Sequence, residues 1–206
     1  ETQFLSDSAN DYAAWDDTYA FIEDGNDEYK TENLIPETFQ NLRLNLLAFI
    51  RKDGTLVWGE VRRDEAKEKA LIDGASLLEA LARADHRLVV HTGSDSKISG
   101  LWLTDLGPLM VGSAPITTSN RDGEMRGAVV MGRFLTSDVI EKISEQTRVA
   151  MTLSLLADIP ASDQPALARL RSGAASWVDA TDLRTLFGYA LFKDVMDQPA
   201  MLLRAE

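Results

Sequence analysis

Few side chains in this sequence are placed to do chemistry, and Arg133 is the one whose surroundings stand out. It is the single charged residue in the apolar segment 127–135. An arginine in a buried strand needs an acceptor, because leaving its charge unpaired is costly. Two acceptors are open: a ligand carboxylate bound in bidentate fashion, or the side chain of Asp16 or Asp17, which would fix an N-terminal helix to a sheet. We favour the structural pair, because acidic residues are abundant near the N-terminus.

Catalysis and cofactor binding have no recognisable motif in this chain. It lacks a phosphate-binding Walker loop, a dinucleotide fingerprint, a G-x-S-x-G nucleophile turn and an H-E-x-x-H zinc motif. The two histidines, His86 and His91, are five residues apart, which suits neither a helical metal pair nor a general base with an obvious partner. We interpret both as structural or surface residues. The chain also has no cysteine. We therefore expect no enzyme activity, no catalytic residue, no metal site and no cofactor.

Four aromatic residues and one serine are further candidates for the wall of a ligand pocket. Trp58 lies on a predicted strand, and Trp102 lies where another segment enters the sheet. Trp15 and Tyr19 are one helical turn apart, a spacing that favours packing in a core or a dimer interface over ligand binding. Ser113 would point from a strand toward a polar ligand, or lie beneath a helix. The predicted ligand-binding set is Trp102, Ser113, Arg133, Trp58, Tyr19 and Trp15.

The elements that must position these side chains follow from the hydrophobic periodicity. Apolar residues recur at steps of three and four from Leu5 to Ile22, which predicts a long N-terminal helix within residues 1–35, interrupted near Gly25. The remaining residues, 36–206, are expected to form one structural unit with it.

Residues 106–135 predict a β-hairpin, with strands at 109–118 and 127–135 and a polar turn at 119–123. Thr136 is a predicted N-cap for a helix through residue 146 whose buried side carries Val139, Ile140 and Ile143. Other strands are predicted at 44–50, 55–61, 149–156 and, two or three of them, within 176–203. Residues 87–91 are predicted to form a short strand or an extended segment. Other helices are predicted to start at Pro36 and to cover 75–83 and 165–171. Antiparallel hairpins with helices outside them indicate an α+β fold.

The net charge of −12 is concentrated at the N-terminus. Residues 1–37 hold eleven acidic residues and one lysine, a local charge of −10. Binding to nucleic acid is therefore not expected, because phosphate neutralisation needs clustered lysine and arginine. The charge pattern is typical of a solvated acidic helix face. No apolar run approaches 18 residues, and no signal peptide opens the sequence, so we expect an excised piece or a mature form.

Several short motifs, in this order and spacing, resemble one known family. Residues 10–24, NDYAAWDDTYAFIED, with Tyr29 and Asn33-Leu34 after them, resemble the opening helix of the fourth class of CHASE domains. The resemblance continues through LNL at 44–46 and the Asp-Gly turn at 53–54. It is strongest at API, 114–116, and at GAVVMGRFL, 127–135. CHASE domains are extracytoplasmic sensing modules of bacterial diguanylate cyclases, phosphodiesterases and sensor kinases.

The resemblance implies a Cache/PAS-related fold, in which a long N-terminal helix packs on a central antiparallel sheet. It also implies a periplasmic domain at the bacterial inner membrane, held by flanking transmembrane helices and joined to a cytoplasmic output domain. A small-molecule ligand of unknown identity would shift the terminal elements, and the N-terminal helix would form a homodimer. The alternative is a non-catalytic interaction or dimerisation domain without a small-molecule ligand. An enzyme with an unfamiliar site is a weaker third interpretation.

Overall fold

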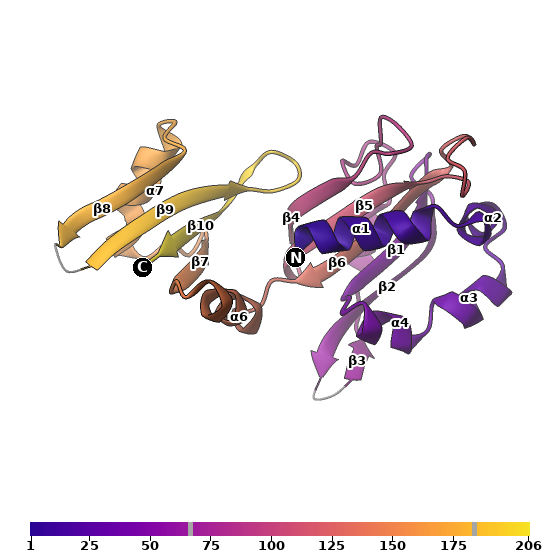
Figure 1. Ribbon diagram of the computed structural model, residues 1–206, viewed down its shortest axis with the longest axis horizontal. Helices are drawn as coiled ribbons and strands as arrows, with labels where there is room; N and C mark the ends of the chain where they lie inside the picture. The colour runs from indigo at the N-terminus through magenta and orange to yellow at the C-terminus, as the bar shows by residue number, and fades with distance from the viewer. Residues whose placement is uncertain (66–67, 183–184) are drawn as a thin grey trace. The chain divides into compact units, whose positions relative to one another are not determined.

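The computed structural model describes residues 1–65, 68–182 and 185–206. The described chain forms two compact units, Glu1–Phe134 and Leu135–Glu206, which we call the first unit and the second unit (Figure 1). The sequence predicts one structural unit that joins residues 1–35 to residues 36–206, whereas the structure divides the chain after Phe134. The N-terminal helices belong to the first unit, where they bury apolar side chains such as Leu5, Phe21 and Ile22.

The first unit is built on a six-stranded antiparallel sheet with the strand order β3-β2-β1-β6-β5-β4. Its strands are β1 (Leu46–Arg51), β2 (Leu56–Glu65), β3 (Glu68–Leu71), β4 (Ile98–Thr104), β5 (Gly107–Ile116) and β6 (Gly127–Phe134). Its helices are α1 (Thr2–Ala13), α2 (Asp16–Asp24), α3 (Asp27–Asn33), α4 (Pro36–Asn41) and α5 (Ala75–Leu81).

The predicted hairpin forms the centre of this sheet. β5 and β6 pair from Leu109 opposite Phe134 to Ile116 opposite Gly127. Both strands are apolar along almost their whole length because elements cover both faces of the sheet. β4 pairs with β5 only as far as Ser113, so Pro115 has no β4 residue opposite it. A proline is tolerated at such a position, since its missing N–H removes no bond to β4.

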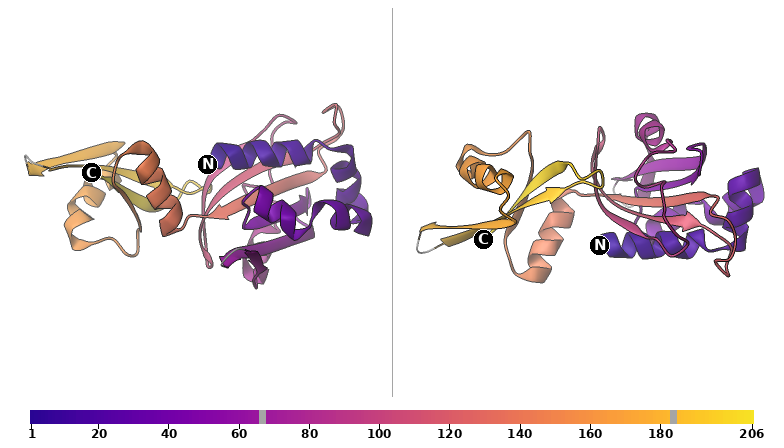
Figure 2. Two further views of the ribbon diagram at one scale, coloured as in Figure 1. Left: turned by 60° about the horizontal axis from the view of Figure 1, so that its bottom comes forward. Right: turned by 90° about the horizontal axis from the view of Figure 1, so that it is seen from above.

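Strand alternation divides the candidate residues between the two faces of the sheet. Gly112 points toward α1, because a Cβ added to it would overlap the backbone of Leu5 and Ser6. Ser113, one residue later, must point to the opposite face. That face is covered by α5 and by residues 82–97, which we call the α5–β4 segment. Figure 2 shows α1 and α5 on opposite sides of the sheet in its right panel.

The predicted long N-terminal helix is wrong in one respect, because it is broken at Trp15, whose backbone is extended (φ −85°, ψ 137°). The interruption predicted near Gly25 is present, since Gly25 ends α2 in the left-handed conformation (φ 62°). The hydrophobic period continues across the first break because Phe21 and Ile22 of α2 are also buried. Asp16 lies in the first turn of α2, where a negative charge is favourable. Periodicity alone therefore could not reveal the break.

The predicted short strand or extended segment at 87–91 is also wrong, because this stretch forms turns within the α5–β4 segment. The N–H groups of Val89 and Val90 both donate to the carbonyl of His86, at 2.8 and 3.0 Å. These bonds close tight turns and leave the backbone unable to join a strand ladder.

The second unit has a four-stranded antiparallel sheet with the order β7-β10-β9-β8. Its elements are α6 (Ser137–Thr147), β7 (Met151–Leu155), η1 (Ala161–Asp163), α7 (Gln164–Arg171), β8 (Ser176–Asp182), β9 (Thr185–Lys193) and β10 (Pro199–Ala205). Thr136 caps α6 as predicted, accepting the N–H of Val139 at 3.4 Å. The apolar side chains of α6 are half-buried. A core around Leu167, Leu170 and Tyr189 joins α7 to the sheet.

Across the described ranges, every helix is too short or too polar to cross a membrane.

Candidate functional site

The first unit contains a partly open cavity of about 240 Å³. Three segments that are far apart in the sequence form it: the β1–β2 turn, the α5–β4 segment and the start of β6. Its lining residues are Lys52, Ala84, Val89, Val90, His91, Met125 and Gly127. The lining is therefore mostly apolar with a few polar groups, which is the composition that small-molecule sites share.

Two backbone contacts bring the three segments together. Gly54 has φ +90°, and a side chain there would overlap the backbone at Arg83 and Ala84. Glycine thus lets the β1–β2 turn touch the beginning of the α5–β4 segment. The N–H of Lys52 donates to the carbonyl of Arg126 at 2.9 Å, which fixes the same turn beside the start of β6.

His91 is held in one neutral form by the hydroxyl groups of Ser113 and Ser96. The hydroxyl of Ser113 donates to the Leu88 carbonyl at 2.5 Å, so its oxygen accepts from His91 Nε2–H at 2.9 Å. His91 Nδ1 is then the acceptor for the Ser96 hydroxyl at 3.1 Å. Burial, together with the nearby positive charge of Arg87, lowers the pKa of the His91 imidazole to about 4. At neutral pH the ring is therefore an uncharged part of the cavity wall.

Trp102 and Ser113, two of the predicted site residues, hold the α5–β4 segment against the sheet. The ring of Trp102 meets the ring of His86 edge-on, with 5.1 Å between their centres. His86 Nδ1 accepts the N–H of Leu88 at 3.2 Å, and burial lowers the pKa of its imidazole. Ser113 is fully buried and contacts His91 directly. Both predicted residues thus lie behind the cavity wall and support it.

Trp58 and Arg133 lie on the other face of the sheet, which the N-terminal helices cover. Trp58 packs beside Phe49, with ring centres 6.2 Å apart. Arg133 donates to a Glu1 carboxylate oxygen at 2.7 Å and to the Arg43 carbonyl at 2.8 Å. The predicted ion pair of Arg133 with Asp16 or Asp17 is therefore wrong. Arg133 does bind the N-terminal segment, but its partner there is Glu1. Asp16 instead accepts the N–H and the hydroxyl of Ser119, each at 2.9 Å.

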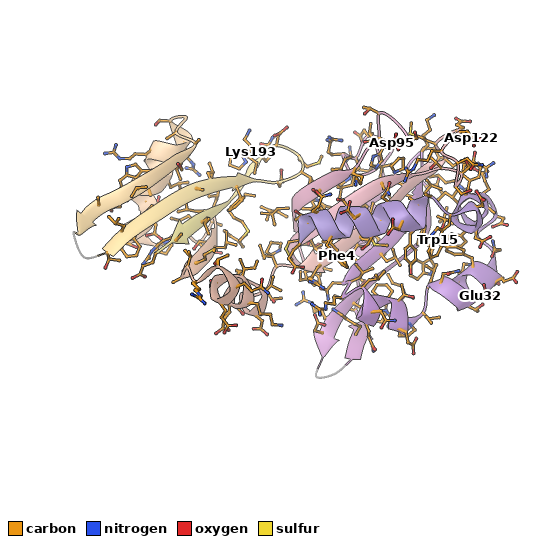
Figure 3. All side chains as sticks on the ribbon, viewed as in Figure 1. Phe4, Trp15, Glu32, Asp95, Asp122 and Lys193 are labelled. Atoms are coloured by element: carbon orange, nitrogen blue, oxygen red, sulfur yellow. The ribbon has the colours of Figure 1, made fainter. Side chains whose placement is uncertain are left out.

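Trp15 and Tyr19 lie at the junction of α1 and α2. Figure 3 shows Trp15 beyond the end of α1, where 39% of its surface is exposed. Its ring stacks on Tyr12 at 4.4 Å. The Arg126 guanidinium lies 3.7 Å from the centre of the Tyr19 ring and donates to the Tyr19 carbonyl at 2.7 Å. These contacts are those of packing residues.

Local sequence patterns do not single out the residues that line the cavity. The turn that carries Lys52 was predicted, and His91 was noted, but nothing local indicated that the two would meet. Among the described residues no group of three metal-binding side chains comes together. Both ring nitrogens of His91 are occupied by hydrogen bonds to serine hydroxyl groups.

Comparison with known proteins places this architecture in a family. The family model for the CHASE4 domain matches residues 1–154. The chain belongs to the CHASE4 family. It is thus an extracytoplasmic sensor domain of a signalling protein, which confirms the expectation drawn from the sequence motifs.

A curated protein is similar to almost the whole of this CHASE4 domain at low sequence identity. The methanogenesis regulatory histidine kinase FilI of Methanothrix harundinacea is 24% identical over 202 residues, which are 98% of the chain. The chain spans only 22% of that protein.

Two solved structures share the fold at 13% identity. One is a domain of a putative sensory box/GGDEF family protein from Vibrio parahaemolyticus (TM-score 0.52, covering 91% of this chain and 81% of that one). The other is the extracellular domain of the putative histidine kinase vpHK1S-Z8 (TM-score 0.50, covering 91% and 77%). The α+β, Cache/PAS-like fold predicted from the sequence is confirmed.

Proposed function

We propose that this CHASE4 domain detects a small molecule in the cavity beneath the α5–β4 segment and passes the signal to an output domain outside this chain. The domain would lie on the periplasmic side of a bacterial inner membrane, anchored by flanking transmembrane helices, and would itself catalyse no reaction. FilI is named a histidine kinase, and one structural neighbour is named a GGDEF family protein. A kinase, a cyclase or a phosphodiesterase is accordingly the proposed class of output.

The observation that carries this proposal is the position of the cavity wall relative to α1. The α5–β4 segment supplies Ala84, Val89, Val90 and His91 to the cavity and is bound to the sheet through Ser113. The neighbouring residue Gly112 touches α1 on the opposite face.

A ligand that moves the wall therefore acts on the same stretch of β5 that supports α1. A coupling free energy of about 1–3 kcal/mol would change the output several-fold to more than a hundredfold. Segments without regular secondary structure are also those that rearrange at the lowest free-energy cost.

A thermal-shift screen of amino acids, carboxylates, polyamines and divalent cations tests the proposal. We expect at least one compound to raise the melting temperature, because a ligand of the native state stabilises it. Val90→Trp should abolish this shift by filling the cavity, since Val90 lines it yet is 44% exposed. Val178→Trp, at an exposed valine of the second unit, is the matched control and should keep the shift.

Hydrogen exchange then tests the coupling. A confirmed ligand should change exchange in α1 and in β10, the terminal elements. Unchanged exchange in both, or a full thermal shift in Val90→Trp, would contradict the proposal.

The alternative function is an interaction or dimerisation domain without a ligand. Exposed aromatic residues in α1 and just after it support this alternative. Phe4 is 48% exposed and Trp15 39% exposed (Figure 3). A homodimer through the N-terminal helices would bury both. Light scattering of the wild type and of Phe4→Ser tests this: the variant should shift the protein toward the monomer, and an unchanged mass would exclude this interface.

A further inference from the structure

The size of the cavity limits its ligand to a compact molecule. Its 240 Å³ exceeds the roughly 150 Å³ of an engineered apolar cavity that binds benzene. It is smaller than the roughly 300–1,000 Å³ of typical sites for drug-sized ligands. Val89, Val90 and Met125 present apolar surface, so the body of the ligand that fits here is a small hydrocarbon group.

The charged residue in the cavity lining is a cation, Lys52. The ammonium group of Lys52 lies beside the Glu124 carboxylate, on an exposed side chain. Arg87 lies on the α5–β4 segment, where its guanidinium donates to the Val90 carbonyl at 3.4 Å. His91 contributes no charge, because both of its nitrogens are held in the neutral hydrogen-bond pattern described above.

The partner of Lys52 can be exchanged easily. Its ammonium contacts a Glu124 carboxylate oxygen at 3.3 Å, and the two side chains are 68% and 78% exposed. Exposed pairs of this kind contribute little to stability. An incoming carboxylate could therefore replace Glu124 without disturbing the fold.

We propose that the ligand is a compact monocarboxylate, with its hydrocarbon body among Val89, Val90 and Met125 and its carboxylate on Lys52 in place of Glu124. This inference rests on the proposed ligand-binding function. The carboxylate lies at the open mouth, where Lys52 reaches solvent, and the apolar body lies inside. A dicarboxylate fits poorly, because its second charge would be desolvated among apolar side chains.

Calorimetry with matched probes tests the charge requirement. The probes are 3-methylbutanoate and benzoate, their neutral amides, and succinate. We expect both monocarboxylates to bind, and their amides and succinate to bind at least about tenfold more weakly, since ion-assisted hydrogen bonds are about twice as strong as neutral ones.

Two substitutions with opposite expected effects on affinity test whether Lys52 binds the ligand carboxylate. Lys52→Gln should weaken binding of the monocarboxylates about five- to tenfold, because it removes the cation. Glu124→Gln should strengthen it about two- to fivefold, because it removes the competing carboxylate. Lys97→Gln is the matched control, since Lys97 pairs with Asp7 at 2.7 Å and does not line the cavity.

The outcomes separate this inference from the proposed function. Equal binding of acids and amides, no binding of either acid, or unchanged affinity in Lys52→Gln would overturn the monocarboxylate assignment. If Val90→Trp still abolishes binding of another compound in those cases, the cavity remains the sensor site. If Val90→Trp leaves monocarboxylate binding intact, the site lies elsewhere and both proposals fail.

Discussion

Arg133 stabilises the first unit by joining segments that are far apart in the sequence. Its guanidinium binds the Glu1 carboxylate, 132 residues away, and the Arg43 carbonyl, while only 12% of its side chain is exposed. Water cannot replace these partners well at such a position. The same residue on an exposed surface would contribute far less.

We predict that Arg133→Met lowers the free energy of unfolding by about 1.5–3 kcal/mol, the range for hydrogen bonds to charged groups. Urea unfolding followed by circular dichroism measures the change. Binding of any cavity ligand should be unaffected, because Arg133 lies on the opposite face of the sheet. Arg83→Met is the control: Arg83 forms an exposed pair with Asp85 at 3.0 Å, and its loss should change stability little. Weaker ligand binding with unchanged stability in Arg133→Met would instead favour the ligand-clamp role.

At the scale of elements, the docking of α1 depends on the absence of a side chain at one strand position. α1 lies along β5 and β6 (Figure 1), and its backbone approaches β5 closely at Gly112. The buried side chains of Leu5, Ala9 and Ala13 fill the space along the rest of this contact. Small residues allow such an approach because they leave the two backbones close enough to pack.

Gly112→Ala should destabilise the protein by about 2–3 kcal/mol, toward the upper end of the range for overpacking. The added methyl group would meet backbone atoms of Leu5 and Ser6, which cannot turn away as a side chain can. Hydrogen exchange should be faster in α1 than in the wild type. Gly188→Ala in β9 is the matched control, since nothing lies within 4 Å of its added Cβ. Equal stability of the two variants would show that α1 does not need this close approach.

At the scale of the whole molecule, the two units have separate cores. In the first unit the core includes Phe21, Phe39 and Phe49, all fully buried. In the second unit it centres on Leu167, Leu170 and Tyr189. A chain of the length of the first unit can bury enough apolar surface to fold by itself, whereas one of about 70 residues is more marginal.

A fragment of residues 1–134 should therefore unfold cooperatively, resist limited proteolysis and keep the ligand affinity of the full chain. A fragment of residues 36–134, cut at the boundary expected from the sequence, should be unfolded. Removing α1–α3 would expose the sheet face that carries Phe49 to water. Calorimetry and proteolysis compare the two fragments. A folded 36–134 fragment would show that the N-terminal helices are an addition to an independent unit.

Much of the fold could be predicted from local patterns. The paired strands of residues 106–135, the cap at Thr136 and the helix that begins at Pro36 follow from turn residues, capping residues and hydrophobic period. These features depend on residues a few positions apart in the chain, so local sequence patterns predict them. The same motifs, in their order along the chain, also identified the family.

The tertiary structure decided how distant segments meet. The break at Trp15, the pair of Arg133 with Glu1 and the meeting of Lys52 with the α5–β4 segment all depend on strand order and on the path of connecting segments. Such contacts join residues tens of positions apart, so no local period encodes them. The sequence by itself determined the central hairpin, the cap at Thr136 and the family, because these depend on residues close together in the chain. Only the packing of the elements could bring the lining of the cavity together.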